Sequence, residues 1–275
     1  MSRLPWHVHP LALLLVLGLG TFQVVTTKDS RRRRYAVFAS LLLLVSVTWP
    51  LGDLAATVSL TAATLQRLLL MLAWAPLWLK SLSVPLVARL TRPALIDGVL
   101  RRLAHPVVAV LVVTVLGTLT LLTPVVDLAA HSSLARGGVV LLTALLGVVL
   151  WFPVEATIPG SRRLSPLGRA GYLFVASLVV TSLSIIWIFA RHPLYPALHD
   201  QQTILGISAL LDQQLAGFLA KLGAFVPLWI TAVVIFSRAD RVGEAQESPL
   251  TWVDVERHFE RSRRRRPPVE ERPGG

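Results

Sequence analysis

The sequence predicts an all-α polytopic membrane protein, a bundle of about seven transmembrane helices with its N-terminus outside and its C-terminus in the cytoplasm. Three observations support this fold class. Hydrophobic residues make up 54% of the 275 residues and charged residues only 15%, whereas soluble domains carry roughly 25% charged residues. The mean hydropathy is +0.64. The apolar residues also form blocks that approach the length of about 20 residues needed to cross a bilayer.

Seven apolar stretches follow one another along the chain. They are His9–Thr26, Tyr35–Pro50, Leu54–Leu79, Val107–Val126, Gly137–Pro153, Ala170–Ala190 and Leu210–Phe236. The first could be a signal peptide, but no small-residue cleavage motif follows it. The basic segment KDSRRRR comes next, which is typical of an anchoring helix. We therefore expect residues 1–238 to form a transmembrane bundle and residues 239–275 to form a basic cytoplasmic tail, partly an amphipathic helix and partly disordered.

The basic residues predict the orientation, because basic flanks of membrane helices stay in the cytoplasm. Segments rich in lysine and arginine alternate with segments that carry at most one such residue. The rich segments are Thr27–Arg34, Lys80–Ala104, Glu155–Arg169 and the tail after Phe236. Seven spans with an outer N-terminus satisfy the rule at every loop. This topology suits a multi-pass protein of the bacterial plasma membrane.

Composition excludes several classes of function. The net charge of +12 could indicate nucleic-acid binding, but the arginines flank apolar blocks instead of forming a folded basic face. The chain has no cysteine, which removes disulfides, thiolate metal sites and cysteine nucleophiles. No nucleophile elbow, glycine-rich phosphate loop, HExxH motif or pair of intramembrane aspartates occurs. We expect a protein that is not an enzyme.

The histidines gather on the predicted outer side. Those placed there are His7, His9, His131, His192 and His199. Neutral imidazole binds copper and zinc, so a metal site is one interpretation. No pair has the i, i+4 spacing of a helical metal site, however, and histidine is tolerated at membrane interfaces. The pattern favours the second interpretation, in which these residues terminate helices, and predicts no metal ligand.

Charged and amide side chains within the apolar stretches are the candidate functional residues. A buried arginine costs about 2.5–3.5 kcal/mol at the centre of a membrane helix, so such residues face a polar interior or a partner. The candidates are Arg67, Asp212, Gln213, Gln214, Gly217 and Lys221. Helical spacing places Gln214, Gly217 or Phe218, and Lys221 on one stripe. Ala216, Ala220 and Ala224 form a second stripe of small residues that would let a neighbouring helix approach.

A different interpretation of the last stretch also fits. The run from Asp212 to Gln214 lies near the end of its span, so these side chains could sit in the outer headgroup region. Lys221 could then extend its amine toward the same interface.

The segment LLDQQLAGFLAKLGAFVPLWITAVVIF resembles the last-helix signature of the CtaG-type cytochrome c oxidase assembly factors, in which Asp-Gln-Gln-Leu-Gly/Ala-Gly precedes an apolar helix. LQRLLLMLAWAPLWLKSLSVP, GVVLWFP and GYLFVASLVVTSLSIIWIFARHPLYP are similar to further segments of that family, in the same order. The similarity covers roughly residues 35 to 238. It implies a membrane assembly factor that acts with the subunits of a respiratory oxidase and helps copper reach it.

The sequence departs from the resembling family at its histidine pairs. A His-Met-x-x-His pair would fall on Ala63 and Arg67, and a second pair near Arg136 and Val140. The chain has two methionines and no cysteine, so it lacks most of the ligands that select Cu(I). Copper is therefore a possible cofactor with most of its expected ligands missing. We interpret Arg67 and Lys221 as fixed charges in place of a metal, balanced by Asp212.

The tail predicts a lipid-surface segment. Thr251 begins a capped helix, and Trp252 lies on its apolar side. The four arginines that follow would each contribute up to about 1 kcal/mol of attraction to anionic lipid. They are Arg263, Arg264, Arg265 and Arg266. A disordered tail whose charge only fixes topology is the alternative.

Taken together, the sequence predicts an integral membrane factor that supports maturation of a cytochrome c oxidase, with a link to copper insertion as one interpretation of that role. The alternative is a transporter of small solutes or anions, in which Arg67, Lys221 and Asp212 line the path.

Overall fold

The computed structural model describes residues 10–27, 29–48, 50–155, 164–198 and 206–246. Every regular element in this part of the chain is helical. The elements are α1 Pro10–Thr26, α2 Ser30–Val47, α3 Leu51–Thr57, α4 Leu60–Leu68, η1 Leu69–Trp74, α5 Ala75–Ser81, α6 Val84–Leu90, α7 Ala94–Leu103, α8 Pro106–Leu119, α9 Thr123–His131, α10 Ser133–Glu155, α11 Pro166–Val179, α12 Ser184–Phe189, η2 Pro196–Leu198 and α14 Ala209–Gln246.

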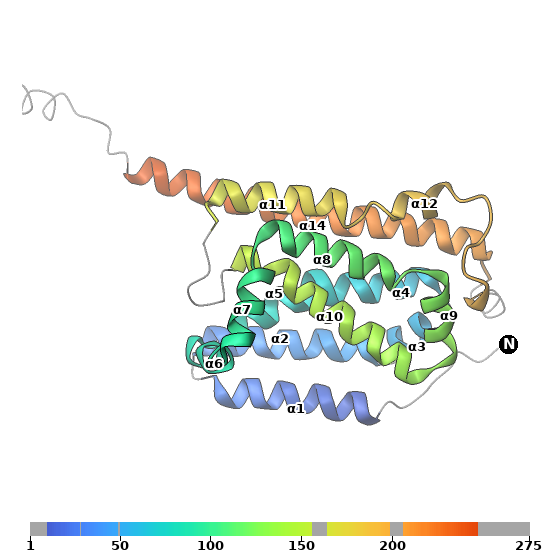
Figure 1. Cartoon of the computed structure of the whole chain (residues 1–275), viewed down its shortest axis with the longest axis horizontal. Coiled ribbons are helices and arrows are strands. Elements are labelled where there is room, and N and C mark those ends of the chain that lie inside the picture. Colours follow the sequence, from blue (N-terminus) through green and yellow to red (C-terminus); the bar gives the residue numbers. More distant parts are fainter. Residues whose placement is uncertain (1–9, 28, 49, 156–163, 199–205, 247–275) are drawn as a thin grey trace, which may run out of the picture.

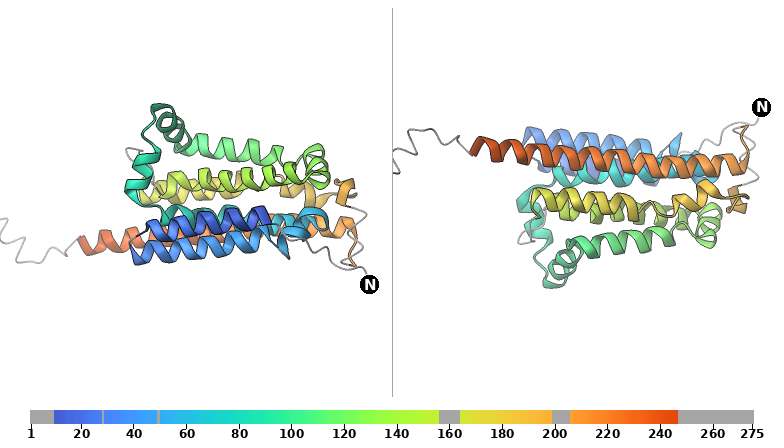
Figure 2. Two further views of the ribbon diagram at one scale, coloured as in Figure 1. Left: turned by 90° about the horizontal axis from the view of Figure 1, so that it is seen from below. Right: turned by 90° about the horizontal axis from the view of Figure 1, so that it is seen from above.

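The long helices lie roughly parallel and form a bundle with two distinct ends (Figure 1). The short helices α3, α9 and α12 lie at one end. Helices α6 and α7, the connection between α1 and α2, and the C-terminal end of α14 lie at the other end (Figures 1 and 2). Among the described residues, the basic segments at the α1–α2 connection, at α6 and α7 and at the end of α14 thus lie on one side of the bundle.

Four helical segments are long and apolar enough to cross a membrane. They are Leu60–Ser81, Ser133–Glu155, Pro166–Phe189 and Ala209–Arg241. Helices α7 and α8 would make a fifth if they count as one span, although the chain bends by 86° between them. An all-helical membrane protein is therefore confirmed among the described residues. A helix occurs in each of the seven predicted stretches, but the count of seven spans and the orientation of the termini stay predictions.

Several predicted boundaries were wrong. The stretch Leu54–Leu79 was expected to be one helix, but α3 ends at Thr57 and α4 begins at Leu60. The break has a local cause, because the Ser59 side chain accepts a hydrogen bond from the Ala62 N–H and so caps a new helix. Helix α14 continues to Gln246, past the end of the predicted apolar stretch at Phe236.

The stretch Ala170–Ala190 is likewise broken, between α11 and α12. Around the break the backbone makes tight i to i−3 hydrogen bonds, such as Ser184 N–H to the Thr181 carbonyl at 3.2 Å. The hydroxyl of Ser184 also donates to the Thr181 carbonyl at 2.6 Å. Serine and threonine hydroxyls compete in this way for helical carbonyls, which explains why the helix is interrupted here.

Helix α4 passes into the π-helical segment η1 because of Pro76. The Ala75 N–H bonds to the Leu70 carbonyl, five residues back. The next donor in this pattern would be residue 76, but proline has no N–H. The Met71 carbonyl receives its hydrogen bond from the Trp151 indole Nε1 of α10 instead, at 2.9 Å. An aromatic donor from a neighbouring helix thus satisfies a carbonyl that the irregular helix leaves open.

Close backbone packing between α10 and η1 positions the centre of the bundle. A Cβ atom at Gly147 would lie 2.7 Å from the Met71 Cα, so only glycine fits at this crossing. Leu146 and Leu150 beside it are almost completely buried. The Tyr172 hydroxyl of α11 donates to the Leu150 carbonyl at 2.7 Å and joins the next helix to the same core.

Candidate functional site

The Asp212 carboxylate of α14 lies at the N-terminus of α4. It accepts hydrogen bonds from the Ser59 hydroxyl at 2.7 Å, the Leu60 N–H at 2.6 Å and the Thr61 N–H at 3.3 Å. The Thr61 hydroxyl donates to the Asp212 carbonyl at 2.9 Å. Asp212 is fully buried.

Helix electrostatics explain why an acid is stable at this buried position. The first N–H groups of a helix have no partner within the helix and carry a partial positive charge. A carboxylate supplied from α14 satisfies them, and Ser59 serves both as the cap of α4 and as a donor to Asp212. The depth of Asp212 in the membrane stays a prediction.

The two glutamines that follow Asp212 bind the loop between α12 and η2. The Gln213 side-chain oxygen accepts a hydrogen bond from the Leu194 N–H at 2.7 Å. The Gln214 amide donates to the Ala190 carbonyl at 3.3 Å, at the end of α12. Both side chains therefore supply hydrogen bonds to backbone that has left its helix.

Gly217 and Lys221 continue the same face of α14 toward α11 and α12. A Cβ atom at Gly217 would lie 2.9 Å from the Ser184 carbonyl oxygen, so the two helices meet backbone to backbone there. The Lys221 amine donates to the Thr181 hydroxyl at 3.2 Å, at the break between α11 and α12. The predicted stripe of Gln214, Gly217 and Lys221 therefore exists, and the α11–α12 segment covers it.

Tyr195 fixes the same loop to the end of α8. Its hydroxyl donates to the Leu121 carbonyl at 2.8 Å and accepts from the Trp187 indole at 3.1 Å. Burial raises the pKa of Tyr195 to about 12, so the phenol stays protonated and keeps its donor. The loop after α12 is thus hydrogen-bonded to the Asp-Gln-Gln segment on one side and, through Tyr195, to the end of α8 on the other.

Arg67 lies in the last turn of α4, at the opposite end from the N–H groups that Asp212 binds. There its side chain caps the C-terminus of α8. Its guanidinium donates to the Gly117 carbonyl at 2.9 Å and to the Thr120 hydroxyl at 2.8 Å, both at the C-terminus of α8. The Leu121 N–H bonds to the Thr118 carbonyl, so the Gly117 carbonyl lacks its usual helical donor. A cation at the negative end of a helix is stabilised by up to about 2 kcal/mol in partly buried geometries.

Arg136 has the same role at the end of α9. It donates to the Ala129 carbonyl at 3.2 Å and to the Ala130 carbonyl at 3.1 Å. Arg67 and Arg136 both fall on or near the positions where the resembling family has histidine. Both donate hydrogen bonds to carbonyl groups at the C-terminus of a helix.

The expected balance of Arg67 and Lys221 by Asp212 was wrong. The cations bind uncharged partners on α8 and at the α11–α12 break, whereas Asp212 binds the N-terminus of α4. Arg67 lies seven residues from Leu60, about 10 Å along the helix. The reason is that helix ends supply the partial charges that Asp212 and Arg67 need, whereas Lys221 binds a hydroxyl.

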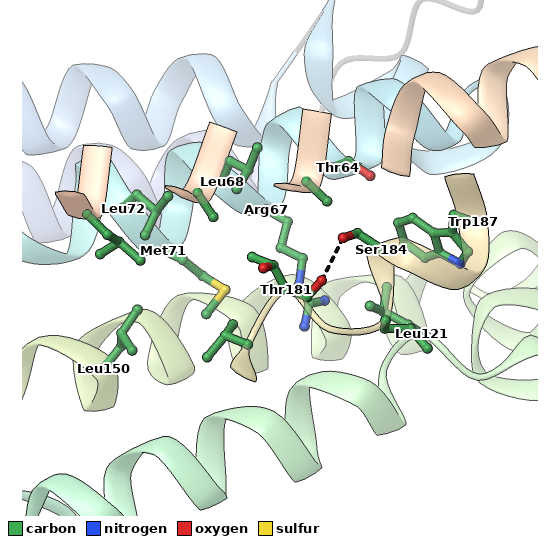
Figure 3. Close-up of a pocket in the computed structure, with 15 residues that line it drawn as sticks. Thr64, Arg67, Leu68, Met71, Leu72, Leu121, Leu150, Thr181, Ser184 and Trp187 are labelled. Carbon is green, nitrogen blue, oxygen red and sulfur yellow. Dashed lines mark hydrogen bonds between the residues drawn. The ribbon is translucent and has the colours of Figure 1, made fainter. Parts of the chain in front are cut away.

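A cavity of about 70 Å³ lies beside Arg67 in the middle of the bundle (Figure 3). Helix α4, η1, α10, α14 and the α11–α12 break all contribute to its lining. Arg67 extends toward the segment that carries Thr181 and Ser184, and Met71 and Leu150 line the apolar side (Figure 3). Ala220 and Ala224 line its α14 side, so their small side chains help to leave the space open.

In the part of the chain that the structure describes, the residues do not fit a copper site. Among the described residues no three histidine, cysteine or acidic side chains converge. Ala63, Arg67, Arg136 and Val140 offer no ligand atom of the kind that Cu(I) selects, and Met71 is the only sulfur in the cavity lining. A guanidinium beside that sulfur would also repel a cation.

The other predicted sites have mixed outcomes. His131 ends α9, where its Nδ1 lies 2.7 Å from the Asp127 carbonyl oxygen, and His192 is exposed in the loop after α12. His7, His9, His199, Trp252 and Arg263 to Arg266 lie outside the described residues. The predicted lipid-surface helix therefore stays a prediction.

The fold and the buried polar contacts define an integral membrane protein of the helical-bundle class. The chain belongs to the cytochrome c oxidase caa3 assembly factor family (Caa3_CtaG), whose family model matches residues 4–241. The family membership that the sequence resemblance predicted is thereby confirmed. In the other two comparisons, no curated protein and no solved structure matches the chain.

Sequence reasoning missed the partners of the predicted residues. Ser59, Thr120 and Thr181 receive or share the contacts of Asp212, Arg67 and Lys221. A lone serine before an apolar run is a recognisable cap signal, so Ser59 could have been found. Nothing in the sequence separates Thr120 and Thr181 from the many other hydroxyls of the spans.

Proposed function

We propose that this protein is a plasma-membrane factor that supports maturation of a respiratory cytochrome c oxidase without itself carrying copper. The family match over residues 4–241 is the observation that carries the assembly role. Its partners would be the lipid bilayer and newly made oxidase subunits. An enzymatic activity is not part of the proposal, since a chaperone-like role needs binding surfaces and no reacting group.

The contacts made by the Asp-Gln-Gln motif residues support a scaffold role. Asp212 joins α14 to α4, Gln213 and Gln214 join it to the loop after α12, and Gly217 allows close contact with α12. Each motif residue therefore holds one part of the bundle to another. A rigid bundle of this kind can present a fixed surface to a client membrane protein.

The side chains at the family's histidine positions support the proposal that the protein does not carry copper. Arginine, alanine and valine stand where the resemblance places family histidines, and the two arginines are engaged with helix carbonyls. The presence of the motif that joins the helices, without those ligands, supports a protein that has the family's shape but does not handle copper. Copper would then reach the oxidase by a different route.

A deletion strain tests the assembly role. Removal of the gene should abolish mature oxidase activity while the oxidase subunits are still synthesised, and a plasmid copy should restore it. Added copper should not replace the missing protein, because its proposed contribution is not copper delivery. Full oxidase activity in the deletion strain would refute the assembly role, and rescue by copper alone would refute the copper-independent part.

A transporter is the second candidate, and the cavity beside Arg67 is the observation that favours it. Reconstituted liposomes distinguish the two functions. Flux of a small anion that disappears on Arg67→Gln, together with normal oxidase in the deletion strain, would favour transport. The basic tail would in either case bind anionic lipid, which vesicle binding with and without residues 248–275 tests.

A further inference from the structure

We propose that the cavity beside Arg67 binds one small inorganic monovalent anion, of which chloride is the test case. The inference does not depend on the oxidase role, because it rests on charge and space inside the bundle. The anion would act as the counter-ion of Arg67 and would hold α4 against the α11–α12 break.

Arg67 has capacity for a further acceptor. A guanidinium has five N–H donors, and those of Arg67 make two hydrogen bonds, to Gly117 and Thr120. Both partners are uncharged. No carboxylate of the described residues lies within ion-pair distance of this guanidinium, and its side chain lines the cavity.

Lys221 is a second cation nearby, but it lies behind the Thr181 side of the cavity and is not among the lining residues. Its amine donates to the Thr181 hydroxyl, and Thr181 itself lines the cavity. The ion pairs of the described residues do not include Lys221. Thr181 therefore lies between the Lys221 amine and the cavity, and Arg67 is the charged residue that lines the space.

An anion beside Arg67 removes an otherwise costly arrangement. A charge within the membrane costs several kcal/mol unless it is paired, and like charges in a medium of low dielectric repel. The end of α8 offsets part of this cost for Arg67. No helix end serves Lys221 in the same way, because its partner is a hydroxyl.

The size of the cavity selects the class of anion. A space of about 70 Å³ exceeds the roughly 10–15 Å³ that one water molecule needs. It accommodates a halide with a few waters, and it is too small for a nucleotide. Thr64, Thr181 and Ser184 add hydroxyl groups to a lining that is otherwise mostly apolar.

Thermal unfolding of the purified full-length protein in detergent tests the proposal. Sodium chloride should raise the Tm in a saturable way, as for any ligand that binds only the folded state. Sodium gluconate at equal ionic strength supplies an anion too large for the cavity and should not. An equal rise in both salts, or no rise in chloride, would overturn the proposal.

Matched variants locate the effect. Arg67→Gln should abolish the chloride-dependent rise in Tm, whereas Arg136→Gln should keep it, because Arg136 caps α9 in the same manner away from the cavity. Persistence of the rise in Arg67→Gln, or its loss in both variants, would place the ion elsewhere and overturn the assignment.

A direct measurement covers the case in which Arg67→Gln does not fold. The wild-type protein should broaden the ³⁵Cl NMR line of chloride, and bromide should reverse the broadening by competition. Ala224→Leu keeps Arg67 but fills part of the cavity, so it should reduce the broadening at least several-fold. Unchanged broadening in Ala224→Leu would contradict binding in this cavity.

Discussion

The Asp212 carboxylate accepts a 2.6 Å hydrogen bond from the backbone N–H of Leu60, across 152 residues of sequence. Together with the Ser59 hydroxyl, this contact joins the last long helix to the beginning of α4. Both partners lie in the interior of the bundle, where no water competes for the N–H groups. The contact therefore specifies how α14 is placed against α4.

Removing the Asp212 carboxylate should destabilise the fold strongly. Asp212→Ala loses hydrogen bonds to a charged group, each of which contributes about 1.5–3 kcal/mol, and leaves the N–H groups of α4 unsatisfied. Asp212→Asn should be intermediate, because its amide keeps one acceptor oxygen. Thermal unfolding of the purified protein in detergent measures the effect as a lower Tm.

Asp97→Ala is the matched control for the loss of an acid. Asp97 pairs with Arg101 at 2.7 Å in a partly exposed contact, and exposed pairs contribute at most about 1 kcal/mol. Its Tm should stay close to that of the wild type. If Asp212→Ala changed the Tm no more than this control, the buried cap would not hold the helices together.

Gly217→Ala should weaken the contact between α14 and α12. The new Cβ would lie 2.9 Å from the Ser184 carbonyl oxygen and 3.0 Å from the Ile188 nitrogen, both backbone atoms that cannot turn away. Overpacking of this kind costs about 1–3 kcal/mol, which should appear as a lower Tm.

Gly138→Ala provides the comparison for Gly217→Ala. Gly138 lies in α10, and a Cβ atom added there would have no neighbouring atom within 4 Å. Replacing it with alanine should leave the Tm unchanged or raise it, since alanine favours the helix by about 0.4–1 kcal/mol. Equal Tm values for the two variants would mean that α14 and α12 are not in close contact.

The positions of the long helices could be predicted from apolar length alone, but their interruptions could not. Leu210–Phe236 and Gly137–Pro153 each lie within one helix. The break after Val179 depends on which hydroxyls bond back to the chain, and the π-helical turn depends on Trp151 replacing a missing donor. The first choice is made by hydroxyls three residues from their carbonyls, which the sequence does not distinguish from the other hydroxyls of the spans, and the second by a residue distant in sequence.

The orientation prediction is testable because the chain has no native cysteine. Gly98→Cys on α7 and His192→Cys after α12 both introduce a thiol at an exposed position. In intact cells a membrane-impermeant thiol reagent should label position 192, and position 98 only after permeabilisation. The reverse pattern would invert the topology, and labelling of both in intact cells would rule out the predicted arrangement of spans.

Which residues matter was more predictable than what they do. Arg67, Asp212 and Lys221 are visible in the sequence because a charge in an apolar stretch is costly. Their partners are a glycine carbonyl, a helix N-terminus and a threonine hydroxyl, which the sequence does not mark as special. Pairing the three charges with one another was the simplest hypothesis, and it failed because helix ends also carry charge.

The copper content of the purified protein tests the central claim most directly, namely that the intramembrane charges hold helices together and do not substitute in a metal site. After anaerobic incubation with Cu(I) and removal of loose metal, the wild type should retain far less than one copper per chain. Ala63→His combined with Arg67→His restores an i, i+4 histidine pair and should retain more. Tight binding of about one copper per chain by the wild type would contradict the account.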